Sequence, residues 1–489
     1  MYFPFSLRHD ISMKEKTQNI LVIVTVALAI FVTNLDITIV NIALPTISKI
    51  FNTGTDEVSR IIVAYLLALV GSLLVFGRLA DQKGIEKVFI IGFVTFTIAS
   101  ILCALSPSIN LLNIFRFLQG FGAAMLLATF GAIILKYLPP EKRGRAFGFI
   151  TVFGGIGVAI GPPVGGFMVQ YLSWHWIFIV NVPIGIIGVT LALRVLNKKH
   201  VTHPATVSAG FDVTGAVLSF VGLFVLFFMM NTADKSGWLT FRNLGMLVFS
   251  ILCFVLFIIR EKKCSNPLID LSVFKIKNLV LGFFALIFVT MVLDGLTFVF
   301  PFFFDLICKL SAGETGLLLM IAPLAIILVS PVSGYLSDLK GPRYVGVIAL
   351  IFMVITTLMV VWFNSSTSYF YIGVAFIAFG IGLALFYTSN TTFIMNYAEK
   401  GREGMLSALL SVVTYLGSSF GIIAFEIVFS RKFDINKSES LSDIPSQIVL
   451  NGYQKAMILG IIISILGLIA IVVAKDKIKV TKITSDQSD

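Results

Sequence analysis

Long apolar runs separated by short polar stretches recur along the whole chain. A helix rises about 1.5 Å per residue, so about 20 residues cross a hydrocarbon core about 30 Å thick. Transmembrane strands would instead need segments of about ten residues that alternate in hydrophobicity, whereas these runs are apolar on every side. The pattern predicts an all-α integral membrane protein with fourteen transmembrane helices, at approximately residues 20–44, 58–79, 88–106, 110–135, 146–168, 177–196, 211–231, 241–260, 279–304, 315–336, 344–363, 369–393, 405–430 and 455–474.

The composition and the distribution of charge agree with this prediction. Of the 489 residues, 57% are hydrophobic and 12% are charged, which leaves too little polar surface to cover a soluble globule. Most of the 36 Lys and Arg residues fall in stretches that are cytoplasmic when both termini lie inside, and only Arg116 lies deep within a span. The net charge of +11 therefore reflects topology, and we expect a multi-pass protein of a prokaryotic cell membrane that contacts the lipid bilayer and no nucleic acid.

One motif occurs twice and divides the chain. The pattern G-x-L-x-D-x-K-G occupies residues 77–84 and, 257 residues later, residues 334–341. Repeats related in this way build two halves around a central site in many transporters. We expect an N-terminal six-helix bundle at 1–200, an inserted pair of helices, the seventh and eighth, at 201–275, a C-terminal six-helix bundle at 276–475 and a cytoplasmic tail at 476–489.

Two acids, Asp36 and Asp294, lie deep within the predicted spans, where charge is costly. An ionised Asp near the middle of a spanning helix costs about 2.5–3.5 kcal/mol on insertion scales, so Asp36 needs a partner or a water-filled cavity. Arg116 lies at a similar depth in its own span, and the pair could either fix helix packing permanently or bind and release a proton. Asp294 is nearly equivalent to Asp36 by the repeat but has no Lys or Arg at matching depth in its half. Glu426 lies near an outer helix end, where we expect it to reach water.

Three other features of the sequence argue against a metal site, an enzyme and a nucleotide-binding site. The four cysteines show neither disulfide nor metal-ligand spacing, so we expect no metal site. Residues 417–421 fit G-x-S-x-G, but they lie inside a predicted helix among small residues, which does not suit a catalytic serine, so we expect no enzyme. The chain has no G-x-x-x-x-G-K-[ST] sequence to bind a nucleotide, so uphill transport would have to use an ion gradient and no cofactor.

Five stretches, in order and in place, carry a resemblance to a known family. They are LDITIVNIALP at 35–45, GRLADQKG at 77–84, RFLQGFG at 116–122, GVAIGPPVGG at 157–166 and WHWIFIVNVP at 174–183. Together they resemble the motifs of the drug:proton antiporters of the major facilitator superfamily, in the fourteen-helix branch. The chain departs from that pattern at His175, where an Arg is usual, and at Ile85-Glu86-Lys87, where more basic residues are usual.

The resemblance implies a major-facilitator fold and proton-coupled export of lipophilic, cationic or zwitterionic drugs by alternating access. For proton coupling we expect Asp36, Arg116 and Asp294. Candidate residues of the substrate cavity are Asn41, Gln119, Phe298, Phe302 and Tyr415. The residues expected to serve the conformational change are Gly77, Asp81, Gly84, Arg145, Gly161, Pro162, Gly165, Gly166, Gly334 and Asp338.

Two other functions fit the same sequence. A narrow-specificity exporter of one antibiotic or metabolite would share the fold and the coupling, and an uncoupled facilitator or membrane sensor would share the fold alone. The expected partners are a small-molecule substrate, protons and the lipid bilayer, and we expect the chain to act as a monomer.

Overall fold

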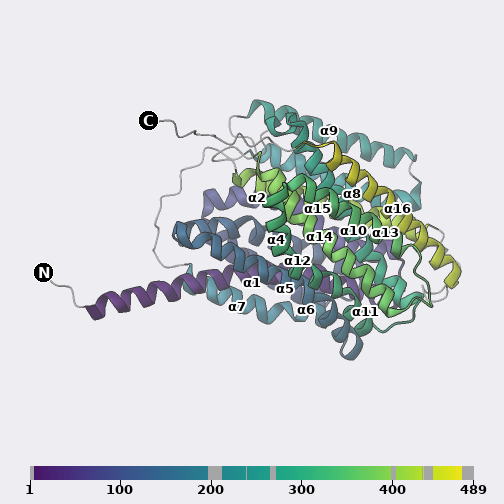
Figure 1. The fold of residues 1–489 in the computed structure, drawn as a ribbon, viewed down its shortest axis with the longest axis horizontal. Helices are drawn as coiled ribbons and strands as arrows, with labels where there is room; N and C mark the ends of the chain where they lie inside the picture. The colour runs from purple at the N-terminus through teal and green to yellow at the C-terminus, as the bar shows by residue number, and fades with distance from the viewer. Residues whose placement is uncertain are drawn as a thin grey trace, which may run out of the picture.

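The computed structural model describes residues 5–196, 212–237, 239–264, 271–397, 403–431, 433 and 444–475. In these residues the protein is a bundle of helices without strands (Figure 1). Fourteen helical segments are long and apolar enough to cross a membrane, which confirms the predicted number. The protein is therefore an all-α integral membrane protein.

The helices follow the predicted spans closely. The first half consists of α1 (Phe5–Phe51), α2 (Thr55–Lys83), α3 (Ile85–Ala104), α4 (Ile109–Tyr137), α5 (Pro140–Tyr171), α6 (Trp176–Ile179) and α7 (Asn181–Val195). The inserted pair consists of α8 (Val213–Ser236) and α9 (Phe241–Lys263), followed by the short 3₁₀ helix η1 (Leu271–Lys275). The second half consists of α10 (Lys277–Leu306), α11 (Ala312–Leu319), α12 (Ile321–Lys340), α13 (Pro342–Val360), α14 (Tyr369–Met395), α15 (Glu403–Ser430) and α16 (Ser446–Val473).

The sixth and tenth spans are each divided into two helices, α6 with α7 and α11 with α12, which the apolar pattern did not predict. The first helix also begins well before its predicted span and projects from the bundle (Figure 1).

Polar side chains cap the N-termini of several helices. Ser108 Oγ accepts the N–H of Leu111 at the start of α4, and Ser368 Oγ accepts the N–H of Tyr371 at the start of α14. At α11, Ser311 and Glu314 bond to each other's backbone N–H in a capping box. These contacts satisfy donors that the first helical turn leaves unpaired, so the chain can turn sharply between spans.

The two halves repeat the same architecture. In the first half α1 packs on α5 and α2 and α3 pack on α4, while in the second half α10 packs on α15 and α12 and α13 pack on α14. The repeated motif ends identically: Gly84 and Gly341 have φ of +101° and +88°, and each donates its N–H to the carbonyl four residues earlier. Only glycine adopts this conformation without strain, which explains both positions. The domain boundaries stay a prediction, and the tail at 476–489 lies outside the described residues.

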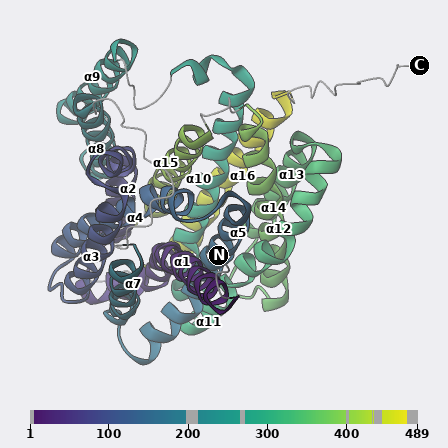
Figure 2. The same ribbon diagram turned by 90° about the vertical axis from the view of Figure 1, so that its left-hand side faces the viewer.

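The halves meet near their outer ends. Lys49 Nζ of α1 lies 2.7 Å from Asp305 Oδ2 of α10. The N–H of Gly313, in α11, donates to Gln170 Oε1 of α5 at 3.0 Å. Viewed from the side in Figure 2, α2, α3 and α4 lie on one side of the bundle, α12, α13 and α14 lie on the other, and α8 and α9 extend beyond α2. These outer contacts hold the two halves together.

Candidate functional site

Asp36 and Arg116 form a salt bridge in the interior of the first half. Arg116 Nη1 lies 2.6 Å from Asp36 Oδ2, and both side chains are 0% exposed. The two helices that carry them, α1 and α4, thus bring together the acid and the base that the sequence placed at similar depth. Because neither group reaches solvent, each depends on the other for compensation of its charge.

Two amides complete the surroundings of the carboxylate. Gln119 Nε2 donates to Asp36 Oδ1 at 2.9 Å, and Asn181 Nδ2 donates to the same oxygen at 2.8 Å. Gln119 also links the network to its neighbours, since its Oε1 accepts from Arg116 Nη1 at 2.6 Å and its Nε2 donates to Ser100 Oγ at 2.9 Å. Gln119, predicted as a cavity residue, is therefore fully buried beside Asp36.

Arg116 is held by more than the carboxylate. Its Nε donates to the carbonyl oxygen of Ile61 at 3.2 Å, and its Cζ lies 4.4 Å from the centre of the Tyr65 ring and 5.7 Å from that of Phe178. Both aromatic faces favour a cation. Arg116 Nη2 and the Tyr65 hydroxyl are buried without a hydrogen-bond partner, so each can still form a hydrogen bond within this network.

Glycines bring the helices of this network close together. A Cβ added at Gly120 of α4 would collide with the carbonyl oxygen of Tyr65 in α2. On α5, a Cβ at Gly165 would lie 2.7 Å from Ile39 Cγ1 of α1, and one at Gly161 would overlap Thr38. A Cβ at Gly166 would collide with Ala312 of the other half. The G-P-P-x-G-G segment is thus a close-packed seam of α5 with both α1 and α11.

Asp294 occupies the corresponding helix of the second half but has different surroundings. Ser418 Oγ of α15 donates to Asp294 Oδ2 at 2.5 Å, and the side chains of Tyr387 and Tyr415 lie within electrostatic range. In the described part of the chain, Asp294 has no salt bridge to Lys or Arg. Asp294 and Tyr415 keep some exposed surface, whereas Asp36 has none. Ser418, which precedes the serine of the G-x-S-x-G sequence, is the hydroxyl partner of this acid, while Ser419 Oγ donates to the carbonyl oxygen of Tyr415 in its own helix.

Comparison with known proteins identifies the family. The profile described as Major Facilitator Superfamily matches residues 26–422. The chain belongs to the Major Facilitator Superfamily. Among relatives in the superfamily, riboflavin transporter RibZ of Clostridioides difficile is 28% identical over 425 residues, covering 87% of this chain and 91% of the relative. Multidrug resistance protein Stp of Mycobacterium tuberculosis is 30% identical over 408 residues, covering 83% of this chain and 75% of the relative.

Solved structures agree on the fold. A bacterial homolog of the human lysosomal transporter Spinster, in an inward-facing conformation, superposes with a TM-score of 0.65 at 16% identity, over 94% of this chain and 97% of that one. A chain of this superfamily with such relatives is a transporter of small molecules and not an enzyme.

The other predicted cavity residues lie in different places. Phe298 and Phe302 of α10 are 0% exposed, with ring centres 5.4 Å apart, and Phe302 packs 6.1 Å from Phe429 of α15. Asn41 is buried in α1 and donates to the carbonyl oxygen of its own helix at Ile37. Of the five candidates, Tyr415 alone is half-buried and the other four are buried, and Tyr415 lies close to Asp294.

The residues expected to serve the conformational change lie at two ends of the molecule. Arg145 and Asp338 are exposed, and the side chain of Asp81 lies outside the described part of the structure. A Cβ added at Gly77 would meet nothing within 4 Å, and one at Gly334 would meet only Thr388, at 3.9 Å. At the other end of the molecule, the carbonyl oxygen of Pro162 packs against Gly316 across the halves.

The expectation for Glu426 was wrong. Its side chain is 4% exposed, and its Oε1 accepts a hydrogen bond from Thr55 Oγ1 at 3.0 Å. The start of α2 packs on α15 at this level and covers the carboxylate, which depth along α15 alone could not show. Glu426 is therefore part of the contact between the halves.

His175 stands where the resemblance led us to expect an Arg. Its ring lies 4.1 Å from that of Trp174, and its Nδ1 lies 3.3 Å from Ser173 Oγ. Partial burial lowers the pKa of His175 below its usual 6.5, so the imidazole is neutral at pH 7. This connection thus has no permanent positive charge at that position.

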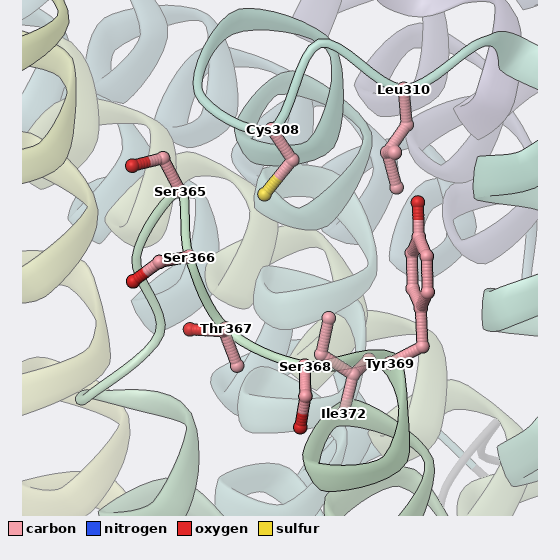
Figure 3. A pocket seen from close by; sticks show the side chains of 8 residues that line it. All are labelled: Cys308, Leu310, Ser365, Ser366, Thr367, Ser368, Tyr369 and Ile372. Atoms are coloured by element: carbon pink, nitrogen blue, oxygen red, sulfur yellow. The ribbon is translucent and has the colours of Figure 1, made fainter.

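A cavity on the outer face is not a convincing binding site. It has a volume of about 230 Å³ and is lined by Cys308, Leu310, Ile372 and the residues of the 365–369 turn (Figure 3). Three of its hydroxyls already bond within the turn or cap α14. Within the described residues, no cluster of His, Cys, Asp and Glu could hold a metal ion.

Proposed function

We propose that this protein exports lipophilic, cationic or zwitterionic compounds across the cell membrane in exchange for protons. The observation that carries the proposal is the fully buried Asp36, whose carboxylate is compensated by Arg116 and two amides. In this proposal Asp36 carries the coupled proton, Arg116 tunes its affinity, and Asp294 is a second proton carrier or a site for a cation.

The coupling rests on competing influences on one carboxyl group. Burial disfavours its charged form, whereas the guanidinium and the amide donors favour it. When a cationic substrate arrives or the two halves separate, this balance changes and a proton binds or leaves. Each charge moved across about 100 mV supplies about 2.3 kcal/mol, so a proton gradient is sufficient to drive export.

Alternating access requires that one side of the molecule be closed while the other is open. Contacts near the outer end join the halves at Lys49 with Asp305 and at Thr55 with Glu426. At the opposite end, an added Cβ at Gly144 or Gly148 would meet nothing within 4 Å. Both observations support an inward-open state. In this state substrate would enter from the cytoplasmic side while Asp36 is still paired with Arg116.

The experiment is transport in proteoliposomes with an imposed pH gradient, using tetraphenylphosphonium, ethidium and riboflavin as test substrates. We expect wild-type protein to accumulate a lipophilic cation when the gradient is applied and to stop when an ionophore dissipates it. Asp36→Asn should abolish gradient-driven accumulation and retain binding. Full transport by Asp36→Asn, or transport that ignores the gradient, would favour the uncoupled facilitator.

The relatives leave two classes of substrate to separate. Stp is named for multidrug resistance and RibZ for riboflavin transport. Accumulation of several unrelated cations would support the multidrug function, and accumulation of a single compound would support a narrow-specificity transporter. We also propose that the functional unit is one chain divided at about residues 200 and 275.

A further inference from the structure

Asn181 lies at the start of α7, in the W-H-W-I-F-I-V-N-V-P segment. Its face of the helix continues through Gly185 and Gly188, where an added Cβ would collide with Thr97 and Phe93 of α3. Because these glycines hold α7 tightly against α3, the amide of Asn181 is fixed beside the carboxylate of α1 and is 0% exposed.

The carboxylate of Asp36 is surrounded by donors only. Arg116 donates to Oδ2, while Gln119 and Asn181 both donate to Oδ1. This arrangement suits the charged carboxylate. A protonated carboxylic acid carries an O–H that needs an acceptor, and a buried O–H without one is strongly disfavoured.

Two of the three partners cannot supply that acceptor. A guanidinium has five N–H donors and no acceptor, which excludes Arg116. Gln119 has a carbonyl oxygen, but that oxygen accepts from Arg116 Nη1 at 2.6 Å, and turning the amide over would set its NH₂ against a donor.

Asn181 differs from Gln119 in this respect. Its Oδ1 is buried and has no hydrogen-bond partner. Half a turn of the side-chain amide would bring this oxygen to Asp36 and move the NH₂ to the place that the oxygen leaves. The far end of the amide is unsatisfied in both orientations, so turning it creates no additional unpaired group.

We propose that Asn181 is a positioning residue for the coupled proton: its amide donates to the charged Asp36 and turns over to accept from the protonated Asp36. The proton comes from solvent and forms an O–H bond at Oδ1, and no other covalent bond changes. This inference rests on the proposed function, because it presupposes that Asp36 is protonated during the transport cycle.

The other ionisable groups near Asp36 are Arg116 of α4, Tyr65 of α2 and Cys103 of α3. The Tyr65 hydroxyl is the competing acceptor, since it too is buried without a hydrogen-bond partner. A Tyr65→Phe variant removes that hydroxyl and leaves the Asn181 amide in place, so the two candidates can be separated.

The test is infrared difference spectroscopy of the full-length protein in liposomes, titrated from alkaline to acidic pH. Protonated Asp36 contributes a carboxylic C=O stretch, which is assigned by its loss in Asp36→Asn. We expect Asn181→Leu to shift this stretch to higher frequency, because the O–H loses its acceptor, and we expect Tyr65→Phe to leave it unchanged. Asn181→Ser, whose hydroxyl both donates and accepts, should return the stretch part of the way to its wild-type frequency.

Asn390→Leu is the matched control. Asn390 is also buried with an unpartnered Oδ1, but its Nδ2 donates to the carbonyl oxygen of Gly282 in the other half of the molecule. An unshifted stretch in both Asn181→Leu and Asn181→Ser would overturn the inference, and a shift in Tyr65→Phe instead would assign the acceptor to Tyr65. If Asp36→Asn removes no titrating stretch, the proposed function itself fails.

Discussion

The residues around Asp36 show how an acid is kept inside an apolar bundle. Its carboxylate accepts from one guanidinium and two amides, and the guanidinium also contacts a backbone carbonyl and an aromatic face. A buried ion pair of this kind is costly to break because either partner alone leaves an uncompensated charge.

Arg116→Ala should therefore destabilise the protein by about 3–5 kcal/mol. The measurement is denaturant unfolding in detergent micelles, with exposed Arg194→Ala as the control. The double variant Asp36→Asn with Arg116→Ala should recover part of the loss, because it removes both charges. An Arg116→Ala variant as stable as Arg194→Ala would contradict the importance of the pair.

The sequence predicted Asp36 and Arg116 because a charge within an apolar span is conspicuous and demands a partner. Asn181 was missed because a neutral amide near the end of a span is inexpensive and draws no attention. Its role depends on a contact between α1 and α7, which no spacing along the chain reveals. The available signal was that Asn181 is a polar residue on a helix face that otherwise carries Gly185, Gly188 and Ala192.

At the scale of helices, small residues set the distances. The contact of α5 with α1 depends on glycines that admit a neighbouring backbone. The apolar pattern did not predict the division of two spans into α6 with α7 and α11 with α12. The signal was Pro183 and Pro323, which have no N–H to donate to the carbonyl four residues earlier, where α6 and α11 end. Hydrophobic length determines that a segment spans the membrane but not whether its helix is continuous.

Two glycines of the same helix provide a matched test of this seam. Gly165→Ala should destabilise the protein by about 1–3 kcal/mol, because the added methyl group overlaps Ile39 of α1. Gly148→Ala should be neutral or stabilising, since nothing lies within 4 Å of the added Cβ and alanine favours the helix. Unfolding in detergent micelles measures both, and equal stability of the two variants would contradict the proposed seam.

In the whole molecule, the inserted pair occupies a position that the sequence did not predict. Phe220 of α8 packs against Gly71 of α2, and Phe227 of α8 lies 5.1 Å from Phe420 of α15. One inserted helix therefore contacts both halves, on the side where α2 and α15 meet (Figure 2). The fourteen spans could be predicted from the apolar runs of the sequence. The packing of α8 on α2 and α15 could not, because it depends on the shapes of the side chains.

The outer contact of the halves gives a prediction about conformation. Lys49→Asp should weaken closure at the outer side, because it places two acids opposite each other at Asp305. The effect should be modest, about 0–1 kcal/mol for the lost pair, since both side chains are partly exposed. Spin-label distances across the outer ends should lengthen in Lys49→Asp and return in the swapped variant Lys49→Asp with Asp305→Lys. Unchanged distances in the single variant would contradict a role of this pair in closure.

The most direct measurement is proton release from purified full-length protein as tetraphenylphosphonium or riboflavin binds, in wild type, Asp36→Asn and Asp294→Asn. If Asp36 carries the coupled proton, binding to wild type releases protons, and Asp36→Asn binds the ligand without releasing them. Asp294→Asn should release fewer protons if that acid is a second carrier. Binding to wild type without release, or undiminished release from Asp36→Asn, would show that the Asp36–Arg116 pair is structural and that coupling resides elsewhere.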